Sequence, residues 1–369
     1  MFYYLSFLSD KISLLNVFQY VTFRGMGAAL TAFLLILAAG PLVIRILVRL
    51  KLGQPIRSSK DVGQQMADLH GSKKGTPTMG GVLILAAVTL SCILWARPNN
   101  EYLWATIGTM LAFGILGFLD DFIKITRKQS EGLTSRQKFT GQLLIAAAVG
   151  SFFILHPDSA KNACTIQIPF LKDAFPFLSN LGWWVLPFLM LVIVGSSNAV
   201  NLTDGLDGLA IGCTVSAASV YTVFAYLTSH VKAAEYLKLQ HVAGTEELAI
   251  FCAALAGAGL GFLWYNCHPA RVFMGDTGAL AIGGALAVVS IAVNQEFLLV
   301  IVGGIFVMEC TSVILQVASF KLTGKRIFAM SPIHHHFQLR GWTETTVVVR
   351  FWILSLVLAL LGLATLKLR

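Results

Sequence analysis

Long apolar runs recur along almost the whole chain, and this pattern limits the possible fold more than any other feature. A helix that crosses the hydrocarbon layer of a membrane needs about 20 apolar residues. Runs close to that length lie at 21–47, 79–96, 102–119, 140–155, 183–200, 209–227, 248–265, 278–293, 297–320 and 347–366. Only 12% of the residues are charged, whereas soluble domains carry about 25%. We therefore predict an all-α polytopic integral membrane protein with about ten transmembrane helices, built as one domain over residues 1–369.

Loop charges indicate how such a bundle crosses the membrane. Most Lys and Arg residues outside the apolar runs follow runs one, three, five, seven and nine, and few lie in the alternate loops. Cytoplasmic loops carry the excess of positive charge, so these five odd-numbered loops are predicted to be cytoplasmic. An even number of spans then places both termini in the periplasm. The first run has no cleavable signal before it and is expected to remain in the mature protein.

The net charge and the cysteines exclude two other classes. The net charge of +9 comes from residues in loops and not from one basic face, which favours positive-inside loops over nucleic-acid binding. Six cysteines form no Cys-x-x-Cys pair, and most fall within apolar runs. Cysteines in such runs pack as small hydrophobic residues. We predict neither a nucleic-acid partner nor a zinc site.

Unusual polar sequence is confined to the same five odd-numbered loops. They read GSKKGTPTMGG, FLDDFIK, SSNAVNLTDGLDGLA, WYNCHPARVFMGDTGAL and SPIHHHFQLRGW. Asp120 and Asp121 end the third run, where two carboxylates oppose the helix macrodipole. A functional pair and two solvated carboxylates are both compatible with this pattern. The agreement between polar motifs and positive charge predicts a functional site on the cytoplasmic face.

Three further acids can each be interpreted either as a helix cap or as part of a functional site. Asp204 and Asp207 precede an apolar run, so either side chain is able to cap the helix that begins there. Their polar neighbours Asn198 and Asn201 exceed what a cap requires. Asp276, in FMGDTGAL, reads as a helix start or as a ligand in a glycine-rich segment that a substrate can approach closely.

Five Asp residues on one face would repel one another unless cations lie between them. Oxygen-rich sites suit Mg²⁺, which binds through a few carboxylates together with substrate phosphates. The sequence therefore predicts Mg²⁺ as cofactor and a substrate that carries phosphate. Nearby lysines serve either as phosphate contacts or as ordinary positive-inside charges. These are Lys73, Lys74, Lys124 and Lys128.

The last loop and the ninth run contain the remaining polar candidates. His334, His335 and His336 are adjacent, and neighbouring side chains in one short loop seldom reach a single metal ion. Contact with phosphate or sugar by one or two of them is the favoured interpretation. Glu309 and Gln316 lie within an apolar run, where such groups normally face the interior or a polar cavity. Both a structural hydrogen bond and a place in the site remain open for them.

These five loops together resemble those of the phospho-N-acetylmuramoyl-pentapeptide transferase family, over residues 22–369. GTPTMGG and HHHF distinguish this family from relatives that transfer N-acetylglucosamine phosphate. The resemblance implies that UDP-N-acetylmuramoyl-pentapeptide reacts with undecaprenyl phosphate, with release of UMP, in the bacterial inner membrane. It also implies Mg²⁺ dependence, contact with membrane lipids and a homodimer. Gln338 departs from the family pattern, which has Glu there in many members.

Matching motif positions give each candidate residue an expected role. The catalytic residues are expected to be Asp120, Asp121, Asp204 and His335. Asp276 is the expected metal ligand. The expected substrate contacts are Lys73, Lys124, Asn198, Asp207, Asn266, Phe273 and His336. Of these, the resemblance implies that Asp207, Asn266 and Phe273 form the uridine pocket, with Phe273 stacked on the base. Whether an Asp first forms a covalent phospho-enzyme is left open.

Two alternatives belong to other functional classes or substrates. A UDP-N-acetylglucosamine:polyprenyl-phosphate phosphotransferase would use the same chemistry on another sugar. A secondary transporter would also have about ten helices, but its polar residues lie near the middle of the membrane. The acids of this chain gather at one face, which favours an enzyme over a transporter.

Overall fold

The computed structural model describes residues 1–50, 75–127, 132–156, 164–168 and 181–366. Within these ranges the regular structure is helical, and nine helices are long and apolar enough to cross a membrane. They are α1 (Val21–Arg49), α5 (Glu101–Thr126), α6 (Ser135–Leu155), α8 (Val185–Thr203), α9 (Leu209–Ser229), α11 (Glu246–Asn266), α12 (Gly275–Ala292), α14 (Gly304–Thr323) and α16 (Glu344–Ala364). A shorter apolar helix, α4 (Gly81–Trp95), matches the second predicted run. The predicted all-helical fold class is confirmed.

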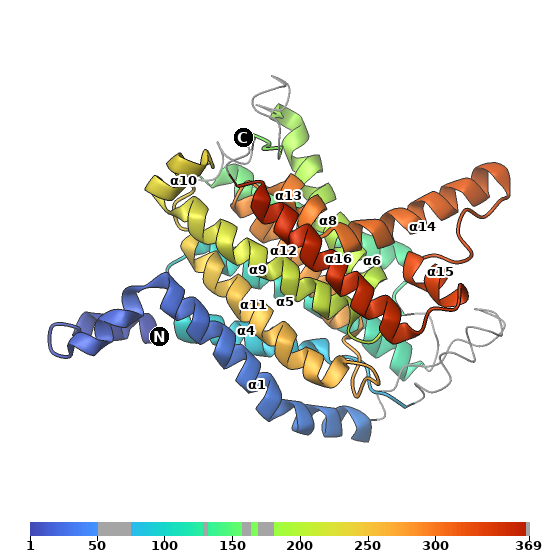
Figure 1. Cartoon of the computed structure of the whole chain (residues 1–369), viewed down its shortest axis with the longest axis horizontal. Helices are drawn as coiled ribbons and strands as arrows, with labels where there is room; N and C mark the ends of the chain where they lie inside the picture. Colours follow the sequence, from blue (N-terminus) through green and yellow to red (C-terminus); the bar gives the residue numbers. More distant parts are fainter. Residues whose placement is uncertain (51–74, 128–131, 157–163, 169–180, 367–369) are drawn as a thin grey trace.

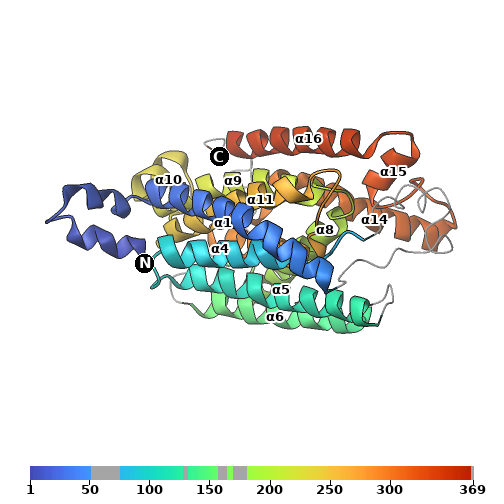
Figure 2. The ribbon, with the colours of Figure 1, turned by 90° about the horizontal axis from the view of Figure 1, so that it is seen from below.

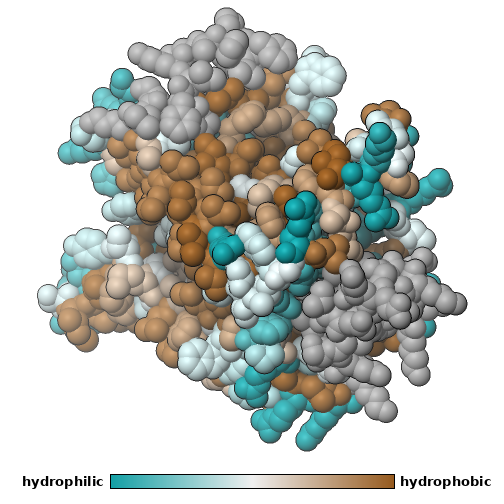
Figure 3. Space-filling view, turned by 45° about the vertical axis from the view of Figure 1, so that its right-hand side comes forward, coloured by the Kyte–Doolittle hydropathy of each residue, from teal (hydrophilic) through white to brown (hydrophobic). Residues whose placement is uncertain are grey.

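The bundle is organised around α12, which is almost entirely buried. This helix packs against α5, α8 and α4, and α16 covers the side opposite α5 and α6 (Figure 2). Outer helices keep apolar residues on the surface, such as Leu360, which is 67% exposed. Figure 3 shows hydrophobic residues over broad areas of one such face. Buried α12 and apolar outer helices are what a bundle requires when lipid surrounds it.

One span that was predicted to be a single continuous helix is interrupted. The run at 297–320 forms two helices, α13 (Glu296–Val302) and α14, which are separated at Gly303. Two consecutive glycines at this point weaken the helix, because glycine has low helix propensity. A Cβ at Gly304 would lie 2.8 Å from Leu358 Cδ1, so the glycine also lets α14 approach α16. Beyond this point α14 projects from the bundle (Figure 1).

Short elements that hydropathy did not predict complete the described fold. They are the 3-10 helices η1 (Phe2–Leu8), η2 (Ser13–Gln19) and η5 (Gly182–Trp184), and the helices α10 (Val231–Leu237) and α15 (Ile333–Leu339). Each is too short to give a transmembrane signal. η1 and η2 lie at the end of the bundle opposite α15 (Figure 2).

Near η1, a buried ion pair joins α1 to α11. Arg24 donates to both carboxylate oxygens of Glu247 at 2.8 Å, and both side chains are fully buried. Glu247 also accepts the backbone N–H of Arg97. This bidentate ion pair and the additional backbone donor compensate for the cost of burying both charges.

Candidate functional site

Three carboxylates meet where the end of α5 lies against the beginning of α12. Asp120 and Asp121 are both 2% exposed, and they share with Asp276 a cluster whose closest oxygens all lie within 4.8 Å of one another. Asp120 and Asp121 were predicted to end the helix, but α5 continues to Thr126. The solvated interpretation of Asp120 and Asp121 is therefore wrong.

Two lysines hold this cluster together. Lys124, on the last turn of α5, lies 3.0 Å from Asp276 Oδ2 and forms an ion pair with Asp120. Lys138, on α6, lies 2.7 Å from the same oxygen of Asp276. Two ammonium groups thus face three carboxylates. Their mutual attraction reduces the repulsion that three buried negative charges would otherwise create.

Each carboxylate is also oriented by a neutral donor. Asp121 accepts the backbone N–H of Thr277 at 3.1 Å and its hydroxyl at 3.0 Å. Asp276 Oδ1 accepts the side-chain amide of Asn201 at 2.8 Å. Asp120 accepts the Leu133 N–H at 2.8 Å. These bonds connect the loop after α5 and helix α8 to the start of α12, so three segments fix one cluster.

Glycines allow this close approach of helices. A Cβ at Gly117 would lie 2.2 Å from the Asp276 carbonyl oxygen. Gly275 has a φ of +73° and would place a Cβ 2.6 Å from Asp121 Oδ2. Any other residue at either position would push the carboxylates apart. This explains why glycines flank the acids in the sequence.

Asp276 begins α12, as its Asp-Thr-Gly context predicted. It lies in the first turn, where the helix macrodipole favours negative charge. Asp204, by contrast, ends α8 and does not cap α9, whose N-cap is Gly208 without a side-chain cap bond. Burial, followed by the negative charges of Asp276 and Asp121, raises the pKa of Asp204 to about 7. The capping interpretation of Asp204 is wrong, and its altered pKa couples it to the cluster.

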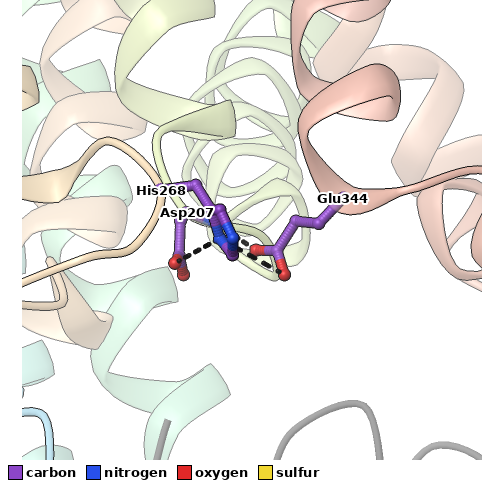
Figure 4. Close-up of side chains that lie close together, drawn as sticks. All are labelled: Asp207, His268 and Glu344. Carbon is purple, nitrogen blue, oxygen red and sulfur yellow. Dashed lines mark hydrogen bonds and ion pairs between the residues drawn. The ribbon is translucent and has the colours of Figure 1, made fainter. Parts of the chain in front are cut away.

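Asp207 belongs to a second cluster a short distance along the same loop. Its Oδ2 lies 3.2 Å from His268 Nδ1 and accepts the Ala270 N–H at 3.0 Å. Glu344 Oε1 accepts the backbone N–H of Asp207 at 2.9 Å. Figure 4 shows His268 between the two carboxylates. The group joins the loops before α9 and α12 to the first turn of α16, and Asp207 does not cap α9 either.

Asn266 and Phe273 lie near this second cluster. Asn266 is buried, accepts the Gly208 N–H at 3.1 Å and donates to the Val272 carbonyl at 2.8 Å. Phe273 is half-buried, and its backbone bonds to Pro77 and Gly80 in the GTPTMGG segment. Asn266 therefore shapes the loop from within, whereas the Phe273 ring is partly accessible.

The polar residues of α14 and α15 have defined contacts. His335 Nδ1 lies 2.9 Å from Gln338 Oε1, and His336 Nδ1 accepts the Ala329 N–H. Gln316 bonds to the backbone of Ile327 and Phe328, which gives it the structural role left open for it. Glu309 pairs with His334 at 3.1 Å.

The remaining candidates form no hydrogen bond to the carboxylate cluster within the described part of the chain, or lie outside that part. Asn198 exchanges hydrogen bonds with the Gln142 amide. Lys73, Lys74 and Lys128 lie outside the described residues. Lys138, His268 and Glu344 were not predicted as site residues, because isolated charged or polar residues form no recognisable motif. Asn201 had a usable signal, since it lies in the polar run with Asp204.

Comparison with known proteins agrees with this arrangement of motifs. The chain matches the glycosyl transferase family 4 model over residues 103–294. It matches phospho-N-acetylmuramoyl-pentapeptide-transferase signature 1 over residues 73–85. Proteins named phospho-N-acetylmuramoyl-pentapeptide-transferase from Methylacidiphilum infernorum, Desulfotalea psychrophila and Pelobacter propionicus are 55%, 52% and 49% identical to it. All three matches cover 100% of both chains.

Proposed function

Since the chain belongs to the phospho-N-acetylmuramoyl-pentapeptide-transferase family, we propose that the cluster of Asp120, Asp121 and Asp276 is its Mg²⁺-dependent catalytic centre. The enzyme catalyses the first lipid-linked step of peptidoglycan synthesis. Its substrates in this proposal are UDP-N-acetylmuramoyl-pentapeptide and undecaprenyl phosphate. The observation that carries the proposal is the meeting of three carboxylates within 4.8 Å at the family motifs.

The donor set of the cluster suits Mg²⁺. Asp120, Asp121 and Asp276 offer carboxylate oxygens, which are the ligands that this hard cation prefers. Asp276 is the principal ligand in this assignment, because it is the most accessible of the three. When bound, the cation would supply positive charge that offsets the diphosphate of the nucleotide-sugar. Lys124 and Lys138 are placed to hold phosphate oxygens as they now hold Asp276.

The reaction requires two anionic groups to meet. An oxygen of the lipid phosphate forms a bond to the β-phosphorus of the nucleotide-sugar, and the bond from that phosphorus to the UMP oxygen breaks. Positioning and charge stabilisation account for most catalysis in phosphoryl transfer. We assign Asp120 and Asp121 as the catalytic pair, and Asp204 and His335 as further catalytic residues on the family motifs. Direct attack and a covalent phospho-enzyme differ in whether a phosphorylated Asp can be isolated.

The nucleotide is assigned to the neighbouring loops. Asp207, Asn266 and Phe273 form the uridine subsite in this proposal on the family motifs, and the half-buried Phe273 is of a residue type that stacks on bases. Asn198, Lys73 and His336 are assigned to phosphate or sugar contacts, on the family motifs alone. The peptide part of the substrate likewise rests on the family.

Turnover against Mg²⁺ concentration tests the metal assignment. In Asp276→Asn the side-chain oxygen that accepts from Asn201 is kept and the negative charge is lost, so turnover should fall by about 100-fold or more. Added Mg²⁺ should recover part of the loss. Asp10→Asn, an exposed acid between η1 and η2, is the control. Equal curves for both variants would remove Asp276 from the metal site.

The orientation of the site is also proposed. The excess of positive loop charge supports a cytoplasmic site, with both termini in the periplasm. Exposed Lys325 and Lys232 lie in the connections after the ninth and the sixth predicted spans, which are on opposite predicted sides of the membrane. In a cysteine-free protein, a reagent that cannot cross the membrane should label Lys232→Cys and not Lys325→Cys in intact spheroplasts. The reverse pattern would invert the topology. The proposed homodimer rests on the family resemblance, and cross-linking in membranes tests it.

A further inference from the structure

His334 is wholly enclosed between helix α14 and the loop that joins α8 to α9. Its Nδ1 lies 3.1 Å from Glu309 Oε1, and both side chains are 1% exposed or less. The backbone N–H of His334 also lies 3.4 Å from Glu309 Oε2. Neither ring nitrogen forms a hydrogen bond to any described residue. The Glu309 carboxylate thus lies beside one edge of the ring, while the other edge faces a neighbouring segment.

That neighbouring segment is Gly205, the residue after Asp204. A Cβ at Gly205 would lie 2.3 Å from His334 Nε2 and 2.7 Å from Cε1. The φ of Gly205 does not lie in the left-handed region that favours glycine. Glycine is therefore required here by the His334 ring and not by the local backbone conformation.

The same loop is fixed from its other end by independent contacts. Glu344 accepts the Asp207 N–H, Asn266 accepts the Gly208 N–H, and Trp352 donates to the Gly208 carbonyl at 3.1 Å. These contacts hold Asp207 and Gly208. At the end of the loop that carries Asp204, the His334 ring lies against Gly205.

We propose that His334 is a positioning residue, which Glu309 holds in place and which sets the position of the loop carrying Asp204 by direct contact with Gly205. This inference rests on the proposed function, because Asp204 is assigned to the catalytic centre there. It gives the first histidine of the HHH run a role different from its neighbours: His335 and His336 are half-buried, and His334 supports the site from inside the protein.

A cycle of two substitutions tests this role. In His334→Asn, the amide nitrogen can take the place of Nδ1 beside the Glu309 carboxylate, while the ring edge that meets Gly205 is removed. Gly205→Ala adds only the methyl group that would meet that edge. Gly195→Ala on α8, where an added Cβ has no neighbour within 4 Å, is the matched control. Turnover, KM for the nucleotide-sugar and thermal midpoint are measured for all variants.

Displacement of a catalytic group by about 1 Å can lower the rate by about 100-fold. Gly205→Ala should show a loss of that order in kcat, with a smaller change in KM, and Gly195→Ala should match the unchanged enzyme. His334→Asn should also lower kcat. Adding Gly205→Ala to His334→Asn should have no further effect, because the clash has been removed.

Loss of kcat by the same factor in both backgrounds would show that Gly205 and His334 act independently, and would overturn the proposal. Unchanged turnover in Gly205→Ala would do the same. Should Gly205→Ala fail to fold, His334→Asn must restore its thermal midpoint, and absence of that rescue also overturns the proposal. The Mg²⁺ dependence of the unchanged enzyme tests the proposed function separately from all of these comparisons.

Discussion

Lys138 Nζ lies 2.7 Å from Asp276 Oδ2, although the two residues are 138 positions apart in the chain. The contact joins the first turns of α6 and α12 at the cluster of acids. A lysine so placed neutralises charge in the resting protein and is within reach of a substrate phosphate.

We expect Lys138→Gln to lower turnover strongly while the fold is kept, because the cluster loses one of its two ammonium groups. The KM for the nucleotide-sugar should rise if the lysine also contacts its phosphates. Arg136→Gln changes an exposed charge on the same turn and should have little effect. Steady-state kinetics of both proteins at one ionic strength measure the difference. Equal activity of the Lys138→Gln and Arg136→Gln proteins would show that Lys138 contributes only its general positive charge.

Asp204 should make stability depend on pH. Its pKa is raised to about 7 from the ordinary value of 3.8, so the folded protein keeps a proton that the unfolded chain has lost between these values. The free energy of unfolding should therefore fall as pH rises through this window. Relative to the unchanged protein, the thermal midpoint of Asp204→Asn should increase as the pH rises from about 4 to about 7, which is roughly the interval between the two pKa values. At higher pH this difference should stay constant. A difference that stays constant over this range would contradict the assignment.

Phe273→Ala should weaken binding of uridine diphosphate. Stacking of a base on an aromatic ring contributes about 1–3 kcal/mol, and calorimetry of the purified protein measures the change. Phe122→Ala removes an exposed ring from α5 and is the control for general loss of aromatic surface. Unchanged affinity in Phe273→Ala would remove this residue from the uridine subsite.

Glu247→Gln should reduce stability without direct damage to the chemistry. The substitution leaves the buried Arg24 charge without its partner, which costs about 3–5 kcal/mol when one member of a buried pair is removed. Glu246→Gln alters the adjacent, partly exposed acid and should change the thermal midpoint much less. The two proteins should differ clearly in thermal midpoint. Similar midpoints would mean that the pair contributes little.

The apolar runs by themselves determined the class of fold. Spans near 20 residues with few charges have one stable arrangement in lipid, which is a helix with all its backbone hydrogen bonds satisfied internally. The motifs also identified the acids, since Asp120, Asp121, Asp204 and Asp276 lie in unusually polar loops. Ends and breaks were less accurate: α5 runs past Asp121, and Gly303 divides the ninth span.

Only the tertiary structure decided which acids share a cluster and which residues support them. Asp207 and Asp204 are three positions apart, yet one pairs with His268 and the other responds to the charge of Asp276. Lys138 and Asn201 reach Asp276 from two other helices. Periodicity specifies which face of a helix is apolar, but the partners of a polar side chain depend on how separate helices pack, and those distances are set by the whole bundle.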